Sequence, residues 1–200
     1  METKFEDISR KALEVLSQKL PAYLTYHSIE HTKYVVKMAE YLAWREDMPD
    51  HDIFLIKVAA LYHDIGFIKT RENHESIGCD IAREELPKEG IHPDDVTKIC
   101  GMIMATKIPQ NPQNLHEEIL ADADLEYLST QNFEPVSEML FKELKHFNPA
   151  FTRKDWRKVQ IDFLSNHCYH TSFCKRYKES FKEQHLLKLK GLDLKSLKGK

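Results

Sequence analysis

The sequence predicts an all-α fold, a helical bundle built as a single domain. Apolar residues recur at helical spacing along most of the 200-residue chain, and no segment alternates apolar and polar residues as a half-buried strand does. Prolines and glycines divide these stretches into lengths typical of helices. At 42% hydrophobic residues, the chain can bury one sizeable core. We expect one domain over residues 1–184 and a basic, lysine-rich tail over 185–200.

Three helices are expected in the first third of the chain. The first covers residues 5–20 and stops before Pro21. The third begins near Asp50, which can cap it, and ends at Gly66, where a left-handed residue would terminate a helix. Between them, one face of the second helix carries a histidine among apolar residues, namely His31, Val35, Met38 and Leu42.

Five further helices are expected in the remainder of the chain. Three of them cover residues 73–86, 93–106 and 117–128, separated by loops that contain proline. Thr152 and Asp155 resemble a capping box that opens a long helix through Phe163. The helix before it is marked by the apolar positions Phe133, Val136, Leu140 and Leu144.

Composition excludes several classes of function. A formal net charge of -3 argues against binding of nucleic-acid polymers, which requires an electropositive face. No stretch is apolar for long enough to span a membrane, and no apolar leader follows the first methionine. The four cysteines form no C-x-x-C pair and are typical of reduced thiols. We expect a cytoplasmic protein that acts on a small molecule, with a homodimer left open.

The stretch V-A-A-L-Y-H-D-I-G-F-I, residues 58–68, places His63 and Asp64 at the end of an apolar helix. Burying a carboxylate without a partner is costly, so both side chains need one. A divalent cation would satisfy an imidazole nitrogen and a carboxylate oxygen together. The dipeptide His51-Asp52 lacks this apolar approach and opens a helix, where an acid favours the helix dipole.

Other residues can complete a shell of ligands around such a cation. His31 lies on the inward face of its helix, and two acids, Asp122 and Asp124, interrupt the apolar run I-L-A-D-A-D-L. Two histidines and two carboxylates suit Mn, Fe, Co, Ni or Zn better than Ca or Mg. Two residues apart on a helix, the two acids point about 200° apart and should not share one ion.

Four motifs occur in an order that resembles the HD-domain superfamily of metal-dependent phosphohydrolases. They are Y-H-S-I-E-H-T, A-A-L-Y-H-D-I-G-F, N-H-E-S and L-A-D-A-D-L, and they lie within about residues 23–128. Members of this superfamily are all-α and hold one or two metal ions with the pattern H…HD…D. The resemblance therefore implies a metal-dependent hydrolase of the HD type.

Carried over by position, the resemblance implies that His31, His63 and Asp64 are metal ligands. In related cyclic-nucleotide phosphodiesterases and alarmone hydrolases the fourth ligand lies in an A-D-L element, which here selects Asp124, with Asp122 as its competitor. His74 falls where binuclear members place a further histidine, or it begins a helix or faces the substrate phosphate. Thr106 and Lys107 stand where such members often have another histidine.

The expected activity is hydrolysis of a phosphate ester, with a nucleotide as the expected substrate, by water activated on the metal. Asp64 would orient this water, while His74 or Lys107 would steady the phosphate or the leaving group. The sequence contains no G-x-S-x-G element or P-loop that would indicate another mechanism. Two alternatives remain: a diiron oxygenase of the HD type, and a nucleotide-sensing module without enzymatic activity.

Overall fold

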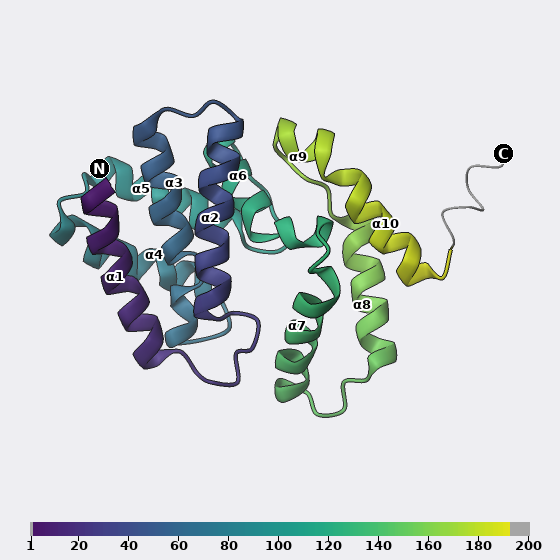
Figure 1. Ribbon diagram of the computed structural model, residues 1–200. Helices are drawn as coiled ribbons and strands as arrows, with labels where there is room; N and C mark the ends of the chain where they lie inside the picture. The colour runs from purple at the N-terminus through teal and green to yellow at the C-terminus, as the bar shows by residue number, and fades with distance from the viewer. Residues whose placement is uncertain (1, 193–200) are drawn as a thin grey trace. The chain divides into compact units, whose positions relative to one another are not determined.

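The computed structural model describes residues 2–192, which form ten α-helices, three short 3-10 helices and no strand (Figure 1). The predicted all-α class is confirmed. No helix in this part of the chain combines the length and the apolar character needed to cross a membrane. The α-helices are α1 (Glu2–Lys19), α2 (Ile29–Arg45), α3 (Asp50–Tyr62), α4 (His74–Glu85), α5 (Pro93–Ala105), α6 (Leu115–Asp124), α7 (Phe133–Phe147), α8 (Arg153–Asn166), α9 (Ser172–Tyr177) and α10 (Glu179–Lys190).

The helices gather into two compact units, divided between Asp124 and Leu125. The sequence shows no linker at this point, because Asp124 ends α6 and the 3-10 helix η3 (Glu126–Ser129) follows almost at once. A single domain over residues 1–184 stays a prediction. The expected start of the basic tail, residue 185, falls within α10, and residues 193–200 of that tail lie outside the described residues.

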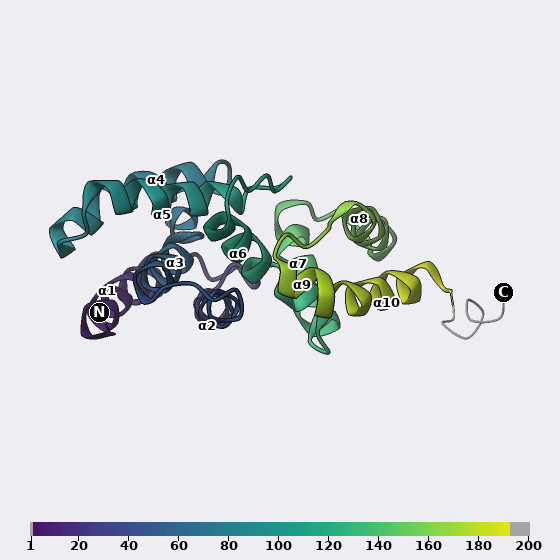
Figure 2. The ribbon, with the colours of Figure 1, turned by 90° about the horizontal axis from the view of Figure 1, so that it is seen from above.

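The first unit consists of two layers of helices. Figure 2 shows α1, α2 and α3 as one layer and α4 and α5 as the other, and α6 packs against both α2 and α5. Helix α3 lies at the centre, since it packs on α1 and α2 within its own layer and on α5 in the other. Its residues from Phe54 to Tyr62 are all buried, which explains its continuous apolar sequence.

The end of α3 differs from the prediction. The helix stops at Tyr62, and Gly66 lies in the 3-10 helix η1 (Ile65–Ile68) without the left-handed backbone that was expected of it. Gly66 is needed for a different reason. A Cβ atom at this position would lie 1.9 Å from the backbone oxygen of His74, so only glycine lets α4 begin this close to η1.

The other boundaries of the first unit follow local rules with small shifts. Ser28 caps α2 by accepting a hydrogen bond from the backbone N–H of His31 at 3.3 Å. Pro49, without a side-chain cap, precedes α3 in place of the expected cap by Asp50. Helix α6 begins and ends earlier than predicted, which makes Asp124 its last residue and leaves the carboxylate at a helix end.

The second unit contains α7 to α10. The capping box of Thr152 and Asp155 opens α8 as predicted, whereas α9 and α10 were not anticipated from the sequence. Lys182 of α10 is almost fully buried, and its ammonium group donates hydrogen bonds to the backbone oxygen and, at 3.2 Å, to Nδ1 of His167. A helix with so many lysines and glutamates shows little amphipathic pattern, which hides its buried position.

The close approach at Gly66 predicts a large effect of a single methyl group. We expect the Gly66→Ala variant to lose about 2 kcal/mol of unfolding free energy, because the backbone of His74 must move. Denaturant unfolding of the purified variant measures this loss. Gly101→Ala is the matched control, since its Cβ would meet only the flexible end of Glu117 at 3.0 Å. Equal stability of the two variants would contradict the prediction.

The pKa of His167 predicts a dependence of stability on pH. Burial, and then the charges of Lys182 and His170, lower the pKa of His167 to about 3. The unfolded chain takes up this proton near pH ~6.5 but the folded chain does not, so stability falls as the pH drops below that value. The contribution of His167 should reach about 2 kcal/mol by pH ~5. Denaturant unfolding of wild type and His167→Gln, each at pH ~6.5 and at pH ~5, isolates this contribution. An equal loss of unfolding free energy in the two proteins would contradict the prediction.

Candidate metal centre

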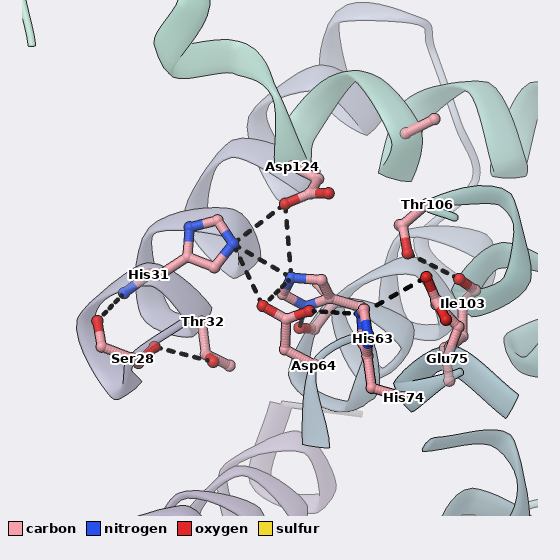
Figure 3. Close-up of polar contacts among 12 residues, drawn as sticks. Ser28, His31, Thr32, His63, Asp64, His74, Glu75, Ile103, Thr106 and Asp124 are labelled. Atoms are coloured by element: carbon pink, nitrogen blue, oxygen red, sulfur yellow. Dashed lines mark hydrogen bonds and ion pairs between the residues drawn. The ribbon is translucent and has the colours of Figure 1, made fainter. Parts of the chain in front are cut away.

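Three segments of the first unit bring two histidines and two aspartates together (Figure 3). His31 comes from the first turn of α2, His63 and Asp64 follow the last residue of α3, and Asp124 ends α6. The Nε2 atoms of His31 and His63 are 3.3 Å apart. Asp124 Oδ1 lies 3.1 Å from the first nitrogen and 3.6 Å from the second. One ligand atom from each of His31, His63 and Asp124 thus lies within 4.8 Å of the others.

Asp64 closes the group from the other side. Its Oδ2 atom lies 3.1 Å from Nε2 of His63 and 3.5 Å from Nε2 of His31. This oxygen is buried and has no hydrogen-bond partner among residues 2–192. A buried carboxylate oxygen without a donor carries the full cost of its desolvation. A cation placed among these atoms would remove that cost.

The tautomer of His63 strengthens this argument. Its Nδ1–H donates to the backbone oxygen of Ala60 at 2.8 Å, so in neutral imidazole Nε2 carries a lone pair. That lone pair faces two carboxylate oxygens and another imidazole nitrogen, and most of these atoms can only accept hydrogen bonds. A backbone carbonyl that fixes the remote nitrogen is typical of metal-binding histidine. The donor set therefore fits a divalent transition metal.

The pKa values of His63 and Asp124 reflect the charges gathered at this position. Burial alone would lower the pKa of His63, but the charges of Asp64 and Asp124 hold it well above its usual range. Burial would raise the pKa of Asp124, yet the contacts with His31 and His63 hold it well below its usual range. Both shifts show that this position stabilises positive charge.

The structure separates the two acids of α6. Asp124, with a side chain 14% exposed, lies against His31, whereas Asp122 is fully buried and is not part of the group that converges within 4.8 Å. A helix places residues two apart on different faces, so only one of the two can reach the histidines. Sequence reasoning predicted the separation of the two acids and placed the ligand at Asp124, with Asp122 as its competitor.

His74 approaches the outer side of Asp64 (Figure 3). Its Nε2 atom lies 3.4 Å from Asp64 Oδ1 and 3.6 Å from Glu75 Oε1. Its Nδ1–H donates to the backbone oxygen of Arg71 at 3.1 Å, which leaves Nε2 to carry any exchangeable proton. Burial would lower the pKa of His74, but the Asp64 carboxylate outweighs burial and raises it. The Asp64 carboxylate therefore favours the protonated form of His74.

Thr106 has a structural role, whereas its neighbour Lys107 lies near the candidate centre. Thr106 is buried at the end of α5, and its hydroxyl donates to the backbone oxygen of Ile103 at 2.8 Å. Lys107 is exposed, and its ammonium group donates to Oδ1 of Asn73 at 3.0 Å. Asn73 precedes His74 and has a left-handed backbone with φ of 55°. Lys107 thus lies beside the start of α4, whose first residue is His74.

The dipeptide His51-Asp52 is separate from this centre. His51 lies 3.2 Å from Asp95 of α5, and Asp52 lies 3.1 Å from His116 of α6. Both residues belong to the first turn of α3 and link it to neighbouring helices. The apolar run before His63-Asp64, which His51-Asp52 lacks, thus distinguished the two dipeptides in the sequence.

Sequence reasoning missed His27 and Phe67. The ring of Phe67 is stacked on His27 with centroids 4.2 Å apart and on His74 at 4.0 Å. Burial raises the pKa of Asp64, and the charge of His63 lowers it. The charge of His27 is the next largest influence and also lowers this pKa. The spacing of His27 and His31, four residues apart in Y-H-S-I-E-H, was the available signal.

The position of Asp124 predicts a contrast between two variants. We expect Asp124→Asn to bind a divalent transition metal at least about tenfold more weakly, since one anionic ligand becomes a neutral amide. Asp122→Asn should keep the affinity for metal, because its side chain lies outside the convergent group. Metal titration with elemental analysis, on variants shown to be folded by circular dichroism, measures both. A greater loss of metal affinity in Asp122→Asn than in Asp124→Asn would reverse the assignment.

Comparisons with known proteins agree with this fold. A predicted HD superfamily hydrolase from an uncultured Thermotogales bacterium is 21% identical, with a TM-score of 0.57 over 91% of each chain. Bacillus subtilis YpgQ, solved in complex with ADP, is 16% identical, with a TM-score of 0.66 over 94% of each chain. A protein from Lactobacillus plantarum is 19% identical, with a TM-score of 0.65 over 96% of this chain and 97% of its own.

No curated protein gives a significant match to the chain. The model of the HD domain family matches residues 27–126, half of the chain, and this range contains every residue of the centre described above. The order of the motifs, the helical fold and the convergence of His31, His63 and Asp124 agree with this match. The chain belongs to the HD domain family.

Proposed function

We propose that this protein is a metal-dependent phosphohydrolase that hydrolyses a phosphate ester of a nucleotide. The observation that carries the proposal is the buried Oδ2 atom of Asp64, which faces two imidazole nitrogens without a hydrogen-bond donor. Together with Asp124, these side chains offer two nitrogen and two oxygen ligands. We assign His31, His63, Asp64 and Asp124 as the protein ligands of one divalent ion.

Such a set suits Mn, Fe, Co, Ni or Zn. When bound, an ion of this kind lowers the pKa of water from about 16 to about 7 and withdraws charge from a phosphoryl oxygen. The chain supplies the rest of the chemistry. His31, His63 and Asp124 hold their ligand atoms within 4.8 Å of one another before any substrate arrives, so little reorganisation is needed.

Asp64 has two separate tasks in this mechanism. Its Oδ2 atom faces the two imidazole nitrogens, and its Oδ1 atom faces His74 at 3.4 Å. The inner oxygen therefore serves as a ligand. The outer oxygen accepts a hydrogen bond and can orient the attacking water towards the phosphorus atom.

His74 and Lys107 act on the phosphate side. Asp64 raises the pKa of His74, and in its protonated form His74 can donate from Nε2 to the oxygen of the leaving group. Lys107 provides a positive charge next to the start of α4 that offsets charge on the phosphate. Both residues are more exposed than the fully buried His63, as residues that meet a substrate must be.

The nucleotide part of the proposal draws on the family and its neighbours. Bacillus subtilis YpgQ was solved with ADP, a nucleoside diphosphate, and shares the fold over 94% of this chain. The HD centre described here lies in the part that matches the family model. We therefore propose a nucleotide as the substrate, bound with its phosphate towards the aspartates and histidines.

Metal analysis followed by an activity screen tests this function. The purified protein should bind about one equivalent of a divalent transition metal and release phosphate from one or more nucleotides or generic phosphate esters. Asp64→Ala should lose metal and activity together, because it removes a ligand and the group that orients water. Absence of bound metal after reconstitution with each of the five ions would refute the proposal.

Two further variants separate binding of the metal from catalysis. His74→Gln should keep the metal and lower kcat by about 100-fold, as expected for loss of a general acid. His51→Ala, which changes the other His-Asp dipeptide of the chain, should match wild type in both measurements. Dioxygen consumption without phosphate release would instead favour an HD-type oxygenase.

A further inference from the structure

We propose that the second unit carries a binding site for a small carboxylate, built from residues other than those of the candidate metal centre. The site is a cavity of about 410 Å³. Pockets that bind small molecules have volumes of roughly 300–1,000 Å³. The helices α7, α8 and α10 supply its lining, and all of its residues belong to the second unit. The inference goes beyond the proposed function and does not depend on it.

Two buried side chains line this cavity with hydrogen-bond donors that have no partner. Ser137 of α7 is 5% exposed, and Trp156 of α8 is 8% exposed. Neither the Ser137 hydroxyl nor the indole N–H of Trp156 makes a hydrogen bond with another of the residues 2–192. Most buried polar side chains form hydrogen bonds within the protein. Two free donors in one cavity therefore indicate a ligand that accepts hydrogen bonds.

Arg157 of α8 adds a positive charge to the same cavity. Its Nε–H donates to the backbone oxygen of Leu189 in α10 at 2.8 Å, which orients the guanidinium group. Its two terminal nitrogens make no hydrogen bond within the described part of the chain. A guanidinium group can donate two parallel hydrogen bonds to one carboxylate. Arg157 is thus the anchor for the two oxygens of such a ligand.

Aromatic and aliphatic side chains form another part of the wall. Phe133, only 4% exposed, stacks on His185 with ring centroids 4.6 Å apart. The ring of Trp156 and the side chain of Leu189 also line the cavity. Burial lowers the pKa of His185, so this residue adds no charge at neutral pH. These surfaces fit a ligand with an apolar carbon skeleton next to its carboxylate.

The other charged residues of the cavity form ion pairs. Arg153 of α8 donates hydrogen bonds to both carboxylate oxygens of Glu138 in α7. Lys188 of α10 donates to Glu134 of α7. The positive charge of Arg157 therefore remains as the net charge of the cavity. One positive charge suits a singly charged carboxylate better than a doubly charged phosphate, which the two glutamates would also repel.

The fluorescence of Trp156 can report binding at this cavity, because the chain has only one other tryptophan, Trp44. In full-length protein with Trp44→Phe, titration with phenylacetate should change the emission until it saturates, with a Kd of about 1 mM or lower. Phenylacetamide, which has no charge, should bind at least about tenfold more weakly. Phenyl phosphate should also bind more weakly than phenylacetate.

Three variants in this background assign the site to its residues. Ser137→Ala and Arg157→Gln should each weaken binding of phenylacetate by about tenfold, as expected for loss of a hydrogen bond to a charged group. Ser137→Ala should not lower the free energy of unfolding, because the hydroxyl has no partner in the protein and alanine favours helices. Ser165→Ala, an exposed serine of α8 outside the cavity, is the matched control and should bind normally.

Several results would overturn the proposal. One is the absence of a saturable response of Trp156 to both phenylacetate and octanoate up to about 10 mM. Unchanged affinity in Ser137→Ala and Arg157→Gln, or equal binding of phenylacetamide, would leave an apolar cavity without a carboxylate site. Tighter binding of phenyl phosphate would exclude the assignment to a carboxylate.

A variant of the candidate metal centre keeps this result apart from the proposed function. Asp64→Ala, which should lose the metal, should still bind phenylacetate as the protein with Asp64 does. Loss of phenylacetate binding in Asp64→Ala would place the ligand at the metal centre and overturn the site in the second unit. Binding of phenylacetate by a protein that holds no metal and hydrolyses no ester would refute the enzyme and leave this site intact.

Discussion

The structure of the first unit depends on one electrostatic constraint, the convergence of lone pairs at the end of α3. His63 is fully buried, and the oxygens and nitrogens around its Nε2 atom almost all accept hydrogen bonds. Bringing such groups out of water costs several kcal/mol per charged group. Core packing of α3 on α1, α2 and α5 holds these groups together, and a cation bound among them would offset the cost.

Two glycines make the geometry of the centre possible. Gly66 lets the start of α4 approach η1, and Gly78 lets the same helix pack on the end of α3, where a Cβ would lie 2.9 Å from the backbone oxygen of Tyr62. Helix α4 is thus held at two points along its length. Its first residue, His74, gains its position beside Asp64 from this backbone packing as well as from its own contacts.

Much of the fold and of the centre could be predicted from the sequence, because both depend on local patterns. Helical periodicity gave the all-α class, and the apolar run before His63 distinguished its dipeptide from His51-Asp52. The role of Gly66 could not be predicted, since it arises from a contact with His74, eight residues away, and not from its own backbone angle. His27 was missed because its place beside the centre depends on ring stacking with Phe67, a contact between segments far apart in the sequence.

Asp64 links the two halves of the centre because its two oxygens face different environments. The inner oxygen lies against His31 and His63, in a region that favours positive charge, and the outer oxygen lies against His74. A cation held at the inner oxygen would withdraw charge from the carboxylate and weaken the outer oxygen as a hydrogen-bond acceptor for His74. A carboxylate in this position would therefore connect the ligand shell of a cation with the residue on the phosphate side, which a ligand with a single donor atom could not do.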